Sequence, residues 1–119
     1  MSKKILIVDD EDDVIIFLET LFKKEGFETV TAKDGVEALA RLKEGVPDLI
    51  TLDLQKPKDT GTDFYRNIRR DKTFSKIPVI VVSGMPGRHL AIPRPVAVFE
   101  KPIDRDELIQ TVKETLDLD

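Results

Sequence analysis

The chain contains no cysteine, only one tyrosine and only one histidine among its 119 residues. Without cysteine there are no disulfides, no thiol nucleophile and no thiolate metal site, so oxygen atoms are the metal ligands to consider. No apolar run approaches membrane-spanning length and no apolar leader opens the chain, so we expect neither a membrane span nor a signal peptide, and a cytoplasmic location by default. The net charge of -4 argues mildly against nonspecific nucleic-acid binding.

What is present is the composition of one ordinary globular domain, with 40% hydrophobic and 35% charged residues. A chain of this length buries most of its apolar surface without crosslinks. No repeat, low-complexity stretch or linker divides it. We therefore expect residues 1–119 to form a single domain.

Strand-like and helix-like segments alternate along the chain. Five short runs rich in aliphatic or β-branched residues predict strands, at residues 5 to 8, 27 to 32, 49 to 52, 79 to 82 and 96 to 99. Helical periodicity follows four of them, in segments that end near residue 25, before residue 45, near residue 71 and near residue 116. This alternation predicts a doubly wound α/β fold, in which a five-stranded parallel sheet carries helices on both faces.

The segment after the fourth strand is hostile to a helix. It contains the following prolines and glycines: Gly84, Pro86, Gly87, Pro93 and Pro95. Each interior proline costs a regular helix roughly 3 kcal/mol, so at most residues 88 to 92 could form a helical turn. We expect the fourth helix to be degenerate or missing. His89 lies in this segment, and we interpret it as a solvent-facing loop residue.

Polar residues follow four of the five predicted strands. Asp9 and Asp10 follow the first strand, Asp53 the third, Ser83 the fourth and Lys101 the fifth. Taken singly, each has an ordinary explanation as a loop acid, a helix cap or a surface lysine. The carboxyl ends of the strands share one edge of a doubly wound sheet, however, so these side chains could converge. Clustered carboxylates suit Mg²⁺, and a carboxylate can attack phosphorus when a metal ion and a lysine neutralise charge.

The acidic run at residues 9 to 13 divides into two parts. Glu11, Asp12 and Asp13 are explained as the solvated start of a helix, whose dipole favours negative charge. Asp9 and Asp10 are not, because carboxylates at the end of a buried strand are costly unless a cation compensates them. Further on, Tyr65 and the Arg69-Arg70 pair are interpreted as helix surface.

Taken together, the motifs resemble a known family over essentially the whole chain. They stand in this order: the pair Asp9-Asp10, Asp53 with Pro57 and Gly61 behind it, Ser83, and Lys101-Pro102. In this order they resemble the receiver (phosphoacceptor) domains of bacterial two-component response regulators. The resemblance implies a flavodoxin-like sheet with strand order 2-1-3-4-5 and a phosphorylation-dependent signalling switch, not a turnover enzyme.

The resemblance also implies a role for each site residue. Asp53 would be the phosphoacceptor, and Asp9, Asp10 and Asp53 would hold Mg²⁺ with the backbone carbonyl of Gln55. Ser83 would contact a phosphoryl oxygen.

Lys101, which would precede a cis peptide bond to Pro102, would pair with the phosphoryl group. The expected donor is a sensor histidine kinase or a phosphotransfer protein. We expect an output partner of unknown kind, no direct contact with nucleic acid or membrane, and a monomer or weak dimer.

The chain departs from the family pattern beside Lys101. Receivers generally carry Tyr or Phe three residues before the lysine, where this sequence has Val98. Phe99 is one residue late, and because side chains alternate across a strand we expect it on the opposite face. The interval from Ser83 to Lys101 is also about one helical turn shorter than is common in the family. We therefore expect the usual output surface, around the fourth helix and fifth strand, to be remodelled.

Three other functions remain open on the sequence alone. A flavodoxin-type FMN binder would need a glycine- and hydroxyl-rich phosphate loop, where this chain has five acids that repel phosphate. An aspartate-nucleophile phosphatase would carry a second acid two residues after Asp53, where Gln55 stands. A receiver-like interaction module that works without phosphorylation would keep the fold and drop the chemistry.

Overall fold

The computed structural model describes residues 2–54, 60–83 and 95–118. The strands in this part of the chain are β1 (Lys4–Val8), β2 (Glu28–Ala32), β3 (Leu49–Leu52), β4 (Val79–Ser83) and β5 (Ala97–Glu100). The helices are α1 (Asp12–Lys24), α2 (Gly35–Glu44), α3 (Thr60–Arg70) and α4 (Arg105–Thr115). All strand pairs are parallel and the sheet order is β2-β1-β3-β4-β5. The doubly wound fold and the 2-1-3-4-5 order expected from the sequence are confirmed.

The strand sequences match their places in the sheet. The central strands β1, β3 and β4 are buried almost throughout, as expected of aliphatic runs covered by helices on both faces. β2 and β5 lie at the edges of the sheet and are only partly covered. β5 begins and ends one residue later than the sequence pattern predicts.

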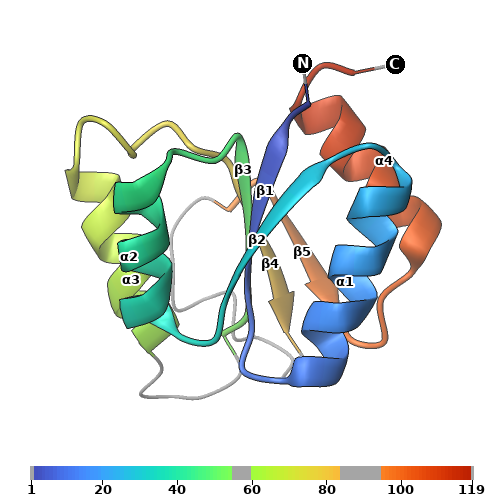
Figure 1. Cartoon of the computed structure of the whole chain (residues 1–119), viewed down its shortest axis with the longest axis horizontal. Coiled ribbons are helices and arrows are strands. Elements are labelled where there is room, and N and C mark those ends of the chain that lie inside the picture. Colours follow the sequence, from blue (N-terminus) through green and yellow to red (C-terminus); the bar gives the residue numbers. More distant parts are fainter. Residues whose placement is uncertain (1, 55–59, 84–94, 119) are drawn as a thin grey trace.

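Helices cover both faces of the sheet (Figure 1). α2 and α3 pack on one face over an apolar cluster that includes Leu6 and Ile50, and α1 and α4 pack on the other over a cluster that includes Ile7 and Leu49. The last helix is capped by Asp104, whose carboxylate accepts the backbone N–H groups of residues 106 and 107 at 3.0 and 3.1 Å. The start of β1 and the end of α4 lie at the upper edge in Figure 1, opposite the edge where the strands end.

Tyr65 is buried, so its interpretation as helix surface was wrong. Its side chain is 1% exposed and belongs to the core against α3. Arg69, one turn later, covers the ring with its guanidinium carbon 4.6 Å from the ring centre, and donates to the carbonyls of Ser75 and Ile77 at 2.7 and 3.0 Å. The arginine satisfies the backbone of the loop and stacks on the ring, which lets an aromatic residue beside a charge enter the core.

The expected loss of the helix after β4 concerns residues 84 to 94, which lie outside the described residues, as does His89. The strands on either side of this segment, β4 and β5, pair directly with each other, and Val82 lies opposite Phe99. Among the described residues, no helix has the length and apolar character needed to cross a membrane.

Candidate functional site

The backbone holds the site residues at the ends of the strands. Beyond the last paired residues the hydrogen-bond ladder continues for one step, as the Asp9 N–H donates to the carbonyl of Ala32 at 3.1 Å and the Asp53 N–H to that of Val8 at 3.0 Å. The Lys101 N–H likewise donates to the carbonyl of Ser83 at 2.9 Å. The side chains therefore project from the rigid edge of a sheet, where groups can be positioned more accurately than on free loops.

Lys101 reaches back across the sheet edge to three carboxylates. Its ammonium nitrogen lies 3.1 Å from Asp9 Oδ2, 3.0 Å from Glu11 Oε1 and 3.9 Å from Asp53 Oδ1. The side chains of Asp9 and Asp53 are only 2% and 4% exposed, and that of Lys101 is 16% exposed. The cation that the sequence required beside Asp9 is thus the side chain from the end of β5.

Burial and pairing act on these groups in different directions. Desolvation raises the pKa of Asp9, against the lowering effects of the Glu11 backbone N–H and of Lys101. For Lys101, burial lowers the pKa, but the hydrogen bond to Glu11 and the charges of Asp53 and Asp9 outweigh it and leave the pKa raised. The lysine therefore keeps its positive charge at the site, because the surrounding acids stabilise the charged form.

Asp9, Asp10 and Asp53 can offer one oxygen each, and these three atoms lie within 4.8 Å of one another. Two oxygens on opposite sides of a Mg²⁺ ion stand about 4.2 Å apart, twice the usual metal–oxygen distance. A small rotation of a carboxylate would close the difference. Asp10 is exposed while the other two are buried, so one side of the triad opens to the solvent that would complete the coordination of the ion. The residues fit a hard divalent cation.

The other predicted site residues fall as follows. Ser83 ends β4 and is 2% exposed, with its backbone joined to that of Lys101. The peptide bond between Lys101 and Pro102 is cis, as the resemblance implies. Gln55 and its carbonyl lie outside the described residues. The structure thus brings Asp9, Asp53 and Lys101 into contact range and places Ser83 at the same edge of the sheet.

Phe99 faces the side of the sheet covered by α1 and α4, where it packs against the cluster of Ile80 and Val82. Val98 points the other way and is 37% exposed. The expectation that Phe99 lies on the face opposite to the customary aromatic is confirmed. Val98 thus occupies the face of β5 on which the resemblance to receivers predicts an aromatic residue.

Sequence reasoning missed the part played by Glu11. It was interpreted as a member of a solvated acidic run, but its carboxylate is the nearest partner of the Lys101 ammonium. One signal was available. Glu11 occupies the N-cap position of α1, where Ser, Thr, Asp or Asn is preferred, and its side chain makes no capping hydrogen bond.

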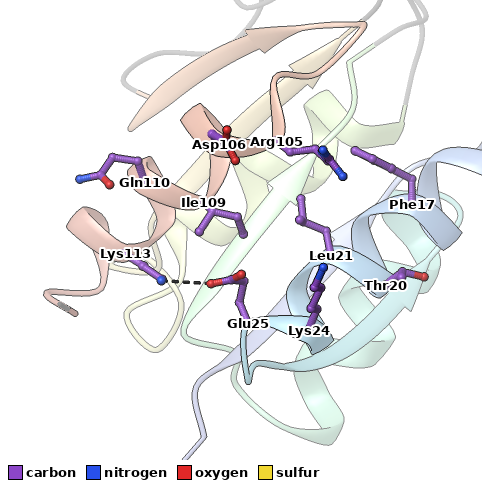
Figure 2. Close-up of a pocket in the computed structure, with 10 residues that line it drawn as sticks. All are labelled: Phe17, Thr20, Leu21, Lys24, Glu25, Arg105, Asp106, Ile109, Gln110 and Lys113. Carbon is purple, nitrogen blue, oxygen red and sulfur yellow. Dashed lines mark ion pairs between the residues drawn. The ribbon is translucent and has the colours of Figure 1, made fainter.

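A groove between α1 and α4 lies away from these carboxylates (Figure 2). It encloses about 700 Å³. Phe17, Leu21 and Ile109 contribute apolar surface, and the ion pair of Lys113 with Glu25, at 3.0 Å, crosses one end. This groove lacks a converging set of acids, so the chemistry that the sequence suggests belongs to the sheet edge.

Comparison with known proteins agrees with this geometry. The polar-differentiation response regulator DivK of Brucella ovis is 32% identical over 120 residues, covering 98% of each chain. Protein Rrf1 of Nitratidesulfovibrio vulgaris is 29% identical over 116 residues, covering 98% of this chain and 84% of its own. The crystal structure of a CheY-like response regulator receiver domain protein from Methanospirillum hungatei superimposes with a TM-score of 0.86 at 26% identity, covering 98% of this chain and 95% of that one.

The family model of the response regulator receiver domain matches residues 5–113. That interval begins in β1 and ends in α4, so it includes all five strands and each residue of the acid and lysine cluster. With the fold, the three clustered aspartates and the lysine in place, the chain belongs to the response regulator receiver domain family.

Proposed function

We propose that this chain is a phosphorylation-dependent switch of a two-component system that accepts a phosphoryl group on Asp53. The observation that carries the proposal is the position of Asp53, buried at the end of β3 with the Lys101 ammonium 3.9 Å from its Oδ1 and two further aspartates within reach of a shared metal ion. An isolated carboxylate would gain little from such surroundings. A carboxylate that becomes an acyl phosphate needs the positive charges of the lysine and of the metal ion, because negative charge accumulates on the transferring oxygens.

The chemical step is a phosphoryl transfer. A carboxylate oxygen of Asp53 attacks the phosphorus of the donor and forms a new P–O bond. The bond from phosphorus to the donor breaks, and the leaving group departs with the electron pair. During the transfer Lys101 moves its ammonium toward a phosphoryl oxygen, and Ser83 at the end of β4 contacts another.

Receiver domains bind Mg²⁺ in an acidic site, and here Asp9, Asp10 and Asp53 are the side chains that would hold it. The backbone carbonyl of Gln55 would be a further ligand. When bound, the ion neutralises charge on the transferring oxygens. The role of this chain's residues is to keep three carboxylates close enough for one cation, which their mutual repulsion opposes.

The donor we propose is a phosphohistidine on a sensor histidine kinase or phosphotransfer protein. Such a partner has to cover the edge where the strands end. Two large apolar side chains stand exposed within a turn or so of the helix starts at this edge, Ile16 of α1 at 60% and Val36 of α2 at 72%. Ile16→Asp is expected to slow phosphorylation by a protein donor and to leave phosphorylation by acetyl phosphate unchanged.

The proposal also covers domain organisation, location, oligomeric state and output. Residues 1–119 act as a single receiver domain in the cytoplasm, as a monomer or weak dimer, and the domain is a signalling element and not a turnover enzyme. Its output partner is a protein that distinguishes the phosphorylated from the unphosphorylated form.

The deciding experiment is intact-mass measurement after incubation with acetyl phosphate and Mg²⁺. The wild type should gain one phosphoryl group, and Asp53→Ala should gain none. Excess EDTA should suppress the gain in the wild type. An unchanged adduct on Asp53→Ala, or full labelling in EDTA, would contradict the assignment and favour a receiver-like module that works without phosphorylation.

A further inference from the structure

Glu11 holds the lysine on which the proposed phosphoryl transfer depends. The Lys101 ammonium is 3.0 Å from Glu11 Oε1 and 3.9 Å from Asp53 Oδ1, so the lysine lies closer to Glu11 than to the proposed phosphoacceptor. Glu11 lies outside the metal-binding triad and is 45% exposed, whereas Lys101 is 16% exposed. The pair therefore joins an exposed acid to a largely buried cation.

The rest of the local structure does not account for this glutamate. As the N-cap residue of α1 it makes no side-chain hydrogen bond to the helix, and it is the backbone N–H of Glu11, not its carboxylate, that supports Asp9 at 2.9 Å. The next acid, Asp12, pairs with Lys33 at 3.0 Å. The Glu11 carboxylate makes its described contacts with Lys101 alone.

The contact between Glu11 and Lys101 affects both the metal ion and the phosphoryl group that the site would bind. The ammonium also lies 3.1 Å from Asp9, where it competes with a metal ion for the same carboxylate. A second anion on the solvent side draws the lysine outward and so lowers its hold on Asp9 and Asp53. The same anion competes with a phosphoryl group on Asp53 for the lysine, because one ammonium has three donors and a limited reach.

We propose that Glu11 is a positioning residue that draws Lys101 toward the solvent side of the site, favouring Mg²⁺ binding before phosphorylation and opposing the lysine's transfer to the phosphoryl group afterwards. Only the effect of Glu11 after phosphorylation rests on the proposed function of Asp53. The effect on Mg²⁺ binding concerns the unphosphorylated protein.

The test compares Glu11→Gln with Asp13→Asn. Both remove one negative charge from the start of α1, but Asp13 is exposed and makes no ion pair among the described residues. Magnesium affinity, measured by calorimetry on the unphosphorylated proteins, should fall about threefold more in Glu11→Gln than in Asp13→Asn. In a Lys101→Met background this difference should disappear, because the effect passes through the lysine.

The second measurement is the rate of phosphorylation by acetyl phosphate at saturating Mg²⁺. Glu11→Gln should raise it by about three- to tenfold over wild type, and Asp13→Asn by less than about twofold. Weaker metal binding together with faster phosphorylation is a combination that general damage to the site would not produce, since damage lowers both.

Equal magnesium affinities in the two variants, a difference that survives in Lys101→Met, or an unchanged or slower rate in Glu11→Gln would each overturn the proposal. Should the wild type fail to accept a phosphoryl group, the proposed function fails. The magnesium measurement then decides alone whether Glu11 positions Lys101.

Discussion

The two faces of the sheet bury different kinds of side chain. Toward α2 and α3, the fully buried residues of β1 and β3 are all aliphatic, among them Leu6 and Leu52. Toward α1 and α4, the same two strands carry Thr51 in their middle and place Asp9 and Asp53 at their ends, all 5% exposed or less. In these two strands one face buries only apolar side chains, and the other also buries polar atoms close to the site.

The difference separates stability from function within one sheet. Apolar burial stabilises a fold in proportion to the area removed from water, whereas each buried polar group has to be paired or lowers stability. The face toward α1 and α4 therefore sacrifices stability to hold charged groups where a ligand can reach them. Removing a buried apolar side chain or the partner of a buried charge should lower stability, whereas removing an unpaired or repelled polar group should raise it, and the predictions below test this from the largest effect to the smallest.

Phe64→Ala should give the largest loss, about 3 to 5 kcal/mol of unfolding free energy, because the ring is 2% exposed in the apolar core against α3. Urea denaturation measures it. Phe17→Ala is the matched control, since that ring is 37% exposed on α1 and should cost much less. Similar losses for the two variants would contradict the burial of the Phe64 ring in the core.

Lys101→Met should destabilise the metal-free protein by about 2 kcal/mol near neutral pH, because Asp9 then keeps its charge at 2% exposure without a cation. The loss stays moderate because the Glu11 N–H still donates to Asp9 at 2.9 Å. Denaturation in EDTA measures it.

The same variant has a defined pH dependence. The folded-state pKa of Lys101 is raised, so its contribution is fully present below the unfolded pKa of lysine, about 10.4, and is lost as pH rises through the folded value. The pKa of Asp9 is also raised, so the free energy of unfolding increases as pH falls through the folded-state pKa toward the unfolded pKa of aspartate, about 3.9. This increase should be larger in Lys101→Met. A wild type and variant that differ by the same amount at every pH would count against the ion pair.

Thr51→Val should stabilise the protein by about 1 kcal/mol. The Thr51 hydroxyl is buried and has no hydrogen-bond partner among the described residues, and valine has nearly the same shape. Thr29→Val is the control, because the hydroxyl of Thr29 donates to Glu19 Oε2 at 3.1 Å and its removal should bring no such gain. Chemical denaturation measures the free energy of unfolding of both variants. A less stable Thr51→Val would mean that the Thr51 hydroxyl stabilises the folded protein.

Asp10→Ala should raise the melting temperature of the metal-free protein slightly, by an amount equivalent to about 0.5 kcal/mol. Its carboxylate stands close to those of Asp9 and Asp53, and removing one of three like charges relieves repulsion while the group itself is exposed. The variant should also lose the stabilisation that Mg²⁺ gives the wild type. Melting curves with Mg²⁺ and with EDTA test both points, and a variant that melts lower without metal would argue against a repulsive cluster.

Much of this protein could be predicted from its sequence because the relevant signals are local. Aliphatic runs of strand length alternate with helical periodicity, and that alternation is enough to predict a parallel sheet with helices on both faces. The positions of Asp9, Asp53, Ser83 and Lys101 at strand ends then place them at one edge, since all parallel strands end on the same side. The opposite orientations of Val98 and Phe99 follow from the two-residue period of a strand.

Tertiary structure alone decided which polar groups meet. Glu11 and Asp12 are neighbouring acids at the start of one helix, yet Glu11 pairs with a lysine ninety positions away and Asp12 with Lys33, because the order of the strands in the sheet sets what each can reach. Tyr65 is adjacent to charged residues but buried, because Arg69 folds over its ring. Pairings of this kind depend on distances between segments far apart in the chain, and these distances exist only once the strands have taken their order in the sheet.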